Sequence, residues 1–260
     1  MNRALLCALL ASVGAYAHAG IRISDEEAMA IGGKIWKNES GGTIDGLTHW
    51  NKGEAFASLG IGHFIWYPAA STGPFTESFP GLLAALAGSG RVLPDWLQGE
   101  PSCPWPDRDV FISDLRGPRL NELRGILAGS VDIQARYAAN RLEAALPKII
   151  EAAPAASRTA LGNRFERVAS VPNGVYALMD YVNFKGEGIN PAERYKGEGW
   201  GLLQVLEGMA DAPAGQASVA AFVKSADAAL TRRVANSLPA RNEARWLPVW
   251  RRRLLSYLEG

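Results

Sequence analysis

Residues 24–42 constrain the fold most, because their signals define a helix and both of its ends. Ser24 and Glu27 have the spacing of a capping box, which is typical of a helix N-terminus. Apolar residues then recur at intervals of three and four, and this predicts a helix with one buried face. Gly41-Gly42 ends the helix. Glu39 therefore lies in its last turn.

A glycine-punctuated hairpin follows this helix, and the rest of the chain is mainly helical. Residues 44–66 are predicted to form a short hairpin unit, with a turn at Asn51-Lys52-Gly53 and a strand and its exit from Phe56 to Trp66. Residues 68–106 are irregular apart from a helix near 79–86. Helical patterns then occupy 107–127, with an interruption near Gly117-Pro118, and also 130–151, 173–184, 201–209, 218–234 and 243–258.

Short strands followed by many helices predict an α+β fold. We expect a single domain over residues 20–260. Its small hairpin lobe would span about 44–66 and its helical lobe about 107–260, with a cleft between the two.

The first 19 residues have the pattern of a secretory signal peptide. A short basic start is followed by an almost wholly apolar stretch, and Ala17-His18-Ala19 forms an A-x-A cleavage pattern before Gly20. The apolar stretch is too short to span a bilayer comfortably, and no later run reaches membrane length. We therefore expect a protein without a transmembrane segment, exported to the periplasm or the extracellular space.

The charge balance argues against nucleic acid as a partner. The chain has 27 basic and 26 acidic residues, and removal of the signal takes away Arg3, so that the two then balance. Phosphate backbones are bound by basic surfaces, which this composition does not favour. Cleavage also removes Cys7 and leaves Cys103 as the one remaining cysteine, so no disulfide can form within the mature chain.

Glu39 is the strongest candidate for chemistry. The partial negative charge of a helix C-terminus opposes ionisation of a carboxylate there, and apolar neighbours such as Ile35 and Trp36 would remove water from it. A carboxylic acid that keeps its proton near neutral pH is suited to protonating a glycosidic oxygen. A glutamate at such a position is more often a solvated surface residue. The Gly-Gly, the hairpin and Gly60-Ile61-Gly62-His63 favour the catalytic interpretation.

Residues 39–63 resemble the phage-type lysozymes of the lysozyme-like superfamily. In that family a catalytic glutamate ends the first long helix, a small hairpin sheet follows, and T-I-G-[IY]-G-H closes it. Here S-L-G-I-G-H at 58–63 matches with conservative changes. The resemblance implies that Glu39 is the catalytic acid, that Ser58 replaces the family's threonine and that His63 plays a structural part near the cleft. Residues 176–188 more weakly resemble a helix of the family's large lobe.

The hairpin departs from the family pattern at the second catalytic group. The family has an aspartate before its threonine, but this hairpin carries extra residues and Lys52 stands where the aspartate is expected. Glu54 or Asp45 can replace it as general base. An inverting and a retaining reaction both remain open. A lytic transglycosylase needs only Glu39, and a glycan-binding protein without activity would also tolerate Lys52.

Several other side chains are candidates for binding a sugar polymer. Trp50, Trp66 and Tyr67 can stack on sugar rings, although each is more often part of a core. His63 and Gln204 are further candidates, the latter because Gly197–Gln204 is similar to a Gly-x-x-Gln segment that lines the cleft in some chitinases and transglycosylases. The basic segment 245–253 is expected to be a solvated helix face with two buried tryptophans.

The sequence thus predicts a secreted, muramidase-like glycoside hydrolase that acts on peptidoglycan or a related, chitin-like amino-sugar polymer. The alternatives are a lytic transglycosylase and a non-catalytic glycan-binding protein. We expect neither a metal nor another cofactor, because the chain after the signal offers only His49, His63 and Cys103 as nitrogen or sulfur ligands. A serine-hydrolase elbow is absent from the sequence.

Overall fold

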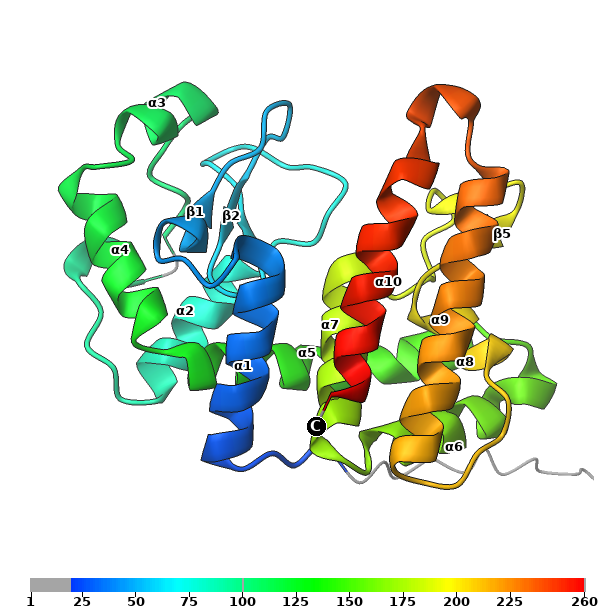
Figure 1. The fold of residues 1–260 in the computed structure, drawn as a ribbon. Coiled ribbons are helices and arrows are strands. Elements are labelled where there is room, and N and C mark those ends of the chain that lie inside the picture. Colours follow the sequence, from blue (N-terminus) through cyan, green and yellow to red (C-terminus); the bar gives the residue numbers. More distant parts are fainter. Residues whose placement is uncertain (1–19, 100, 260) are drawn as a thin grey trace, which may run out of the picture.

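The computed structural model describes residues 20–99 and 101–259, so the signal peptide predicted at 1–19 lies outside the described residues. The described part is mostly helical with a small antiparallel sheet, as expected for an α+β protein. In Figure 1 the sheet, α2, α3 and α4 form one group of elements, and α6 to α10 form another. Helix α5 runs from the first group into the second.

The helices agree closely with the sequence patterns, with one omission. They are α1 (Asp25–Ser40), α2 (Phe79–Gly88), α3 (Arg108–Ser113), α4 (Pro118–Ala128), α5 (Val131–Glu151), α6 (Arg158–Ala169), α7 (Pro172–Lys185), α8 (Leu202–Gly208), α9 (Gln216–Asn236) and α10 (Leu247–Leu255). Helix α6 was not predicted from the sequence. A two-stranded hairpin of β4 (Arg194–Tyr195) and β5 (Glu198–Gly199) was not predicted either.

Helix α1 has the ends that its sequence predicts. The Glu27 amide donates to Ser24 Oγ over 3.1 Å, and the Ser24 amide donates to Glu27 Oε2 over 2.7 Å, which completes the capping box. At the other end Gly41 is left-handed, with φ +65°, and its amide donates to the Lys37 carbonyl. Glu39 is thereby held in the last turn, as expected.

Helix α1 packs closely against α5. The buried face of α1 includes Ala28, Ile31 and Ile35. Gly32 lies on the same face, where a Cβ atom would come within 2.6 Å of a Val131 methyl group. A larger residue at this position would push the two helices apart.

The small sheet has three strands in the order β1 (Thr48–His49), β2 (Ala57–Leu59) and β3 (Phe64–Trp66), each antiparallel to the next. The turn at Asn51-Lys52-Gly53 lies between β1 and β2, as predicted. The exit segment supplies the third strand. Gly60 and His63 both have positive φ in the tight connection from β2 to β3, and the Ile61 amide in that connection donates to Gln134 Oε1 of α5 over 3.0 Å.

Two helices predicted for the helical lobe lie instead beside the sheet. Arg124 of α4 donates to Thr48 Oγ1 of β1 over 2.8 Å, and Phe111 of α3 packs edge-on against Trp50, with ring centroids 5.6 Å apart. The lobe around the sheet therefore extends well beyond residues 44–66. Local periodicity identified these helices but carries no information about which lobe they join.

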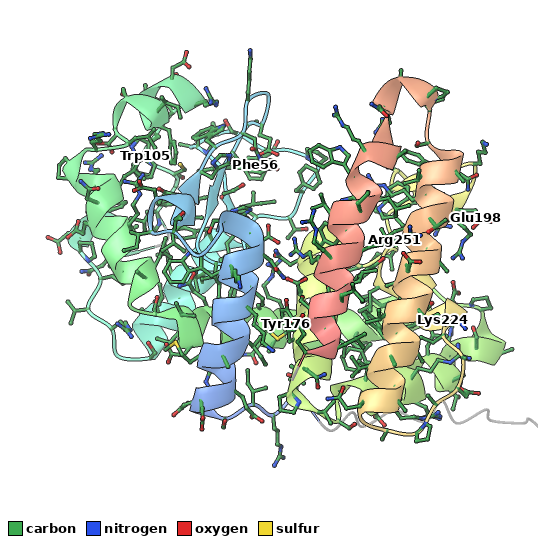
Figure 2. The ribbon with its side chains drawn as sticks, in the orientation of Figure 1. Phe56, Trp105, Tyr176, Glu198, Lys224 and Arg251 are labelled. Atoms are coloured by element: carbon green, nitrogen blue, oxygen red, sulfur yellow. The ribbon has the colours of Figure 1, made fainter. Side chains whose placement is uncertain are left out.

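The core is continuous between the two groups of elements. Trp105 lies among the aromatic residues beside the sheet, and Tyr176 lies between α1 and the C-terminal helices (Figure 2). The Tyr176 hydroxyl accepts from Asn38 Nδ2 over 2.7 Å and shares a hydrogen bond with Ser256 Oγ. Cys103 is a buried free thiol, and burial raises its pKa to about 12. Within the described residues, no helix has the length and apolar character needed to cross a bilayer.

Candidate functional site

Three side chains from distant parts of the chain meet the Glu39 carboxylate. His63 Nδ1, from the loop before β3, lies 3.3 Å from Glu39 Oε2. Asn183 of α7 donates from Nδ2 to Oε1 over 3.1 Å. Arg253 of α10 forms an ion pair and a hydrogen bond with Oε1 through Nη2. With 14% of its side chain exposed, Glu39 is mostly buried but retains access to solvent.

Arg253 is itself fixed by a second, fully buried carboxylate. Its Nε donates to Asp180 Oδ2 over 2.7 Å, and its Nη2 donates to Asp180 Oδ1 over 2.8 Å. Asp180 also accepts from the Tyr257 hydroxyl over 2.6 Å. Burial disfavours the charge on Arg253, but Asp180 and then Glu39 outweigh that effect and raise the pKa of the guanidinium. Arg253 thus remains a fixed positive charge between two carboxylates.

His63 is poised as a neutral partner of Glu39. Burial lowers the pKa of His63 below its ordinary value of 6.5, the Glu39 carboxylate opposes the shift, and His49 adds to it. The backbone of His63 is left-handed, with φ +50°, a conformation that costs energy for a residue with a side chain. A neutral imidazole at this distance can either donate a hydrogen bond to the carboxylate or accept one from the carboxylic acid.

Glu39 opens into a cavity of about 280 Å³ between the sheet and α7, which polar and apolar side chains line together. Helix α5 contributes Arg141 to its lining, and Thr76 and Ser78 add hydroxyl groups. Glu187, which follows α7, is the other carboxylate among the lining residues. Hydroxyl, guanidinium, amide and carboxylate groups around one cavity can form hydrogen bonds with a polyhydroxylated ligand.

The structure does not place Glu54 or Ser58 in this cavity. Glu54 lies after the hairpin turn, where Asn51 Nδ2 donates to its Oε2 over 3.1 Å. Ser58 is 5% exposed within β2, opposite His49 and Ile65. Neither residue lines the Glu39 cavity. Asp45, the other alternative base, is almost fully exposed and lies 3.7 Å from Arg124.

The predicted stacking residues are mainly core residues. Trp66 is fully buried against Phe79 and donates from Nε1 to the Pro101 carbonyl, so that it offers no ring face to a sugar. Tyr67 is buried and packs edge-on against Phe56. Trp50 is 2% exposed, although it lines a different pocket.

Gln204 has a local structural role in the structure. Its Oε1 accepts from the Gly201 amide, and its Nε2 donates to the Gly188 carbonyl, both over 3.0 Å. These bonds fix the start of α8 against the loop after α7. Gln204 does not line the Glu39 cavity.

Arg253, Asp180 and Glu187 were not identified as site residues from the sequence. Arg253 lies in the segment interpreted as a solvated helix face, but its side chain is only 12% exposed. The expectation of two buried tryptophans there was half right, because Trp250 is buried whereas Trp246 is 46% exposed. Asp180 and Glu187 do lie in the stretch 176–188 that resembled a lysozyme helix, and this was the available signal.

Comparisons with known proteins do not identify the site. Comparisons with protein-family models, with curated proteins and with solved structures give no match. Within the described residues, no three histidine, cysteine, aspartate or glutamate side chains are grouped as metal ligands. The geometry around Glu39 is therefore the basis for a functional proposal.

Proposed function

We propose that the protein is a lysozyme-like glycosidase that cleaves peptidoglycan or a related amino-sugar polymer, with Glu39 as proton donor. One observation carries this proposal. A mostly buried carboxylate at a helix end faces a cavity that has hydroxyl, amide, guanidinium and carboxylate groups in its lining, and groups from both sides of that cavity hold it. His63 contacts it from the side of the sheet, while Asn183 and Arg253 contact it from the helical side.

In the proposed reaction Glu39 gives its proton to the glycosidic oxygen while the bond from the anomeric carbon to that oxygen breaks. Glu39 must therefore carry a proton before this step. Neutral His63 is in contact with Glu39 and can hold a hydrogen bond to either form. Water then adds to the anomeric carbon and loses a proton to a base.

Glu187 and Glu54 compete for the role of base. Glu187 lines the cavity that contains Glu39, and this position favours it. Glu54, which the sequence favoured, is held by Asn51 beside the turn. If neither residue acts on water, the site matches a lytic transglycosylase, in which Glu39 is first acid and then base and a hydroxyl of the sugar attacks. Since Glu54 does not line the cavity, this second candidate function requires only that Glu187 is not the base.

The decisive experiment compares wild-type protein with Glu39→Gln on purified peptidoglycan. The amide keeps the size of the side chain but cannot donate the required proton, so the rate should fall at least about 100-fold. Glu26→Gln changes an exposed glutamate on the same helix and serves as the matched control. Hydrolysis yields new reducing ends, whereas transglycosylation yields 1,6-anhydro sugars.

Full activity of a folded Glu39→Gln variant would refute the role of Glu39. If both proteins bind glycan but neither forms products, the non-catalytic alternative is correct. The ion pair with Arg253 would then explain why Glu39 does not donate a proton.

A further inference from the structure

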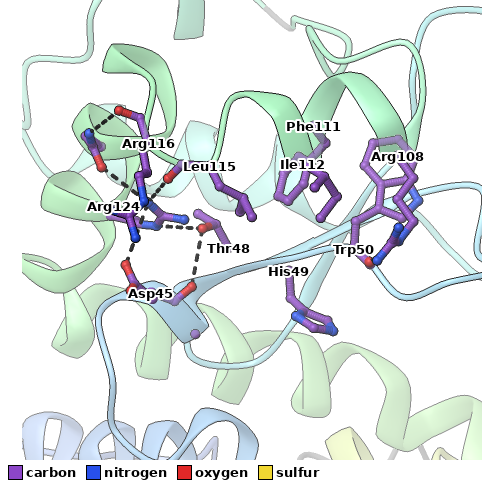
Figure 3. Close-up of a pocket in the computed structure, with 12 residues that line it drawn as sticks. Asp45, Thr48, His49, Trp50, Arg108, Phe111, Ile112, Leu115, Arg116 and Arg124 are labelled. Carbon is purple, nitrogen blue, oxygen red and sulfur yellow. Dashed lines mark hydrogen bonds and ion pairs between the residues drawn. The ribbon is translucent and has the colours of Figure 1, made fainter.

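A second and larger pocket lies between β1 and the helices α3 and α4. Its volume is about 800 Å³, and Figure 3 shows Arg124 at one end and Trp50 with Arg108 at the other. Three arginines line it, the third being Arg116, against a single carboxylate, Asp45. Positive charge is thus concentrated here, although the chain as a whole has nearly equal numbers of basic and acidic residues.

Arg124 places a buried charge at this pocket with little to neutralise it. The residue is 5% exposed, and its guanidinium donates to Thr48 Oγ1 and to the Leu115 carbonyl over 2.8 and 2.6 Å. Its acidic neighbour, Asp45, is 3.7 Å away and has 92% of its side chain exposed. A carboxylate so well solvated compensates a buried charge weakly. An anion bound in the pocket would compensate the Arg124 charge, which Asp45 does only weakly.

The other two arginines also have charge available for a ligand. Arg108 is oriented by a 2.9 Å hydrogen bond from Nε to the Trp50 carbonyl. Among the residues that the structure describes, neither Arg108 nor Arg116 forms an ion pair. Arginine binds planar carboxylates through two parallel hydrogen bonds, which suits a carboxylate ligand in particular.

The walls between these charges are apolar. Phe111 and Ile112 of α3 line the pocket beside Trp50. A ligand that ends in a carboxylate and carries small apolar groups would match both the charge and the walls. A short peptide with a free C-terminus has this chemistry, whereas an unsubstituted neutral glycan does not.

A pair of histidines connects this pocket to the Glu39 cavity. His49 lines the arginine pocket, and its ring stacks with that of His63 at a centroid distance of 6.3 Å. His63 in turn lies 3.3 Å from Glu39 and lines the cavity of Glu39. A ligand that extends from the arginine pocket across these two rings would also occupy the Glu39 cavity.

We propose that the arginine pocket binds the carboxylate of a short peptide substituent on the glycan whose backbone lies at Glu39. The identity of the glycan in this inference rests on the proposed function, whereas the binding of a carboxylate rests only on the residues of the arginine pocket. It predicts selectivity for peptide-bearing over peptide-free glycan, set by Arg108, Arg116 and Arg124 and not by the groups around Glu39.

Binding can be measured apart from catalysis with the Glu39→Gln protein and N-acetyl-alanyl-alanine as probe. NMR titration should show shifts at the pocket, and the C-terminal amide of the same dipeptide should bind at least about tenfold more weakly because it lacks the charge. Arg116→Gln should weaken binding of the acid by about tenfold or more. Arg119→Gln, an exposed arginine three residues further along the chain, in α4 and outside the pocket, is the matched control.

Equal binding of the acid and the amide, or no effect of Arg116→Gln in a protein of unchanged melting temperature, would overturn the proposal. Binding of inorganic phosphate in place of the dipeptide would also overturn it. If Arg116→Gln lowers the melting temperature, Arg116→Lys tests the same point, since it keeps the charge but loses the paired hydrogen bonds and should still weaken binding.

Turnover separates this inference from the proposed function. If both hold, Arg116→Gln raises KM for peptide-bearing glycan more than for peptide-free glycan, and the control Arg119→Gln raises neither. Equal KM values for wild type and Arg116→Gln on peptide-bearing glycan would refute the pocket but leave the Glu39 mechanism intact. Carboxylate-dependent binding of the dipeptide by a protein that cleaves neither glycan would refute only the mechanism.

Discussion

Replacing Arg253 by methionine tests the central ion network of the structure. The change removes two hydrogen bonds to Asp180, of 2.7 and 2.8 Å, and leaves this fully buried carboxylate with the Tyr257 hydroxyl and Asn38 as partners. Loss of one partner from a buried pair costs about 3–5 kcal/mol, because the remaining charge stays buried without compensation. Glu39 adds less to the loss because water reaches it. Methionine keeps much of the length of the side chain, so the cavity contribution is small.

The assay is urea unfolding of Arg253→Met beside Arg252→Met, which alters an exposed arginine on the same helix. We expect the first variant to lose about 3–5 kcal/mol, or roughly 6–20 °C in melting temperature, and the second to stay within about 0.5 kcal/mol of wild type. Adding Asp180→Asn to Arg253→Met should restore part of the loss. Equal stability of the two single variants would refute the argument, and no recovery in the double variant would indicate that packing, not charge, causes the loss.

Two further predictions concern a catalytic base and a buried amine. Because Glu187 lines the Glu39 cavity and Glu54 does not, Glu187→Gln should reduce hydrolysis about 100-fold while Glu54→Gln keeps most activity. The reverse result would assign the role of base to Glu54. Full activity of both variants, with 1,6-anhydro sugars as products, would indicate a transglycosylase. Burial, and then Arg233, lower the pKa of Lys185 from 10.5 to about 6, so between these values the unfolded chain holds a proton that the folded chain does not. The free energy of unfolding of the wild type, measured with urea, should therefore rise from pH 7 to pH 9 relative to that of Lys185→Met, by at most about 1.4 kcal/mol per pH unit. If the difference between the two proteins does not change with pH, Lys185 stays charged between the rings of Phe184 and Trp250.

Local signals in the sequence predicted much of the fold. The capping box at Ser24 and the glycines after Ser40 depend on neighbours a few residues away, and both ends of α1 follow from them. Helix α6 was missed even though Leu161, Phe165 and Val168, which are buried, have helical spacing. That signal was available in the sequence.

The site itself depends on contacts that no local pattern contains. Arg253 reaches Glu39 from 214 residues away and Asp180 from 73 residues away. An arginine in a basic, aromatic helix has the same local appearance whether its side chain faces water or a buried carboxylate. Trp66 shows the converse problem, since a tryptophan on a strand beside a cleft can face either the core or a ligand, and here it faces the core.

Arg253 contacts both the buried carboxylate of Asp180 and the carboxylate of Glu39. Asp180 holds the guanidinium through two hydrogen bonds that do not involve Glu39, so Arg253 would stay charged and in place throughout the proposed reaction. Glu39 is bound on one side by His63 of the sheet region and on the other by Asn183 and Arg253. Its position is therefore set by how the two groups of elements dock. A substitution that shifts this docking slightly would misplace the proposed proton donor before it unfolds the chain. Proton transfer depends on distances within hydrogen-bond reach, whereas the core on either side of the cavity remains packed.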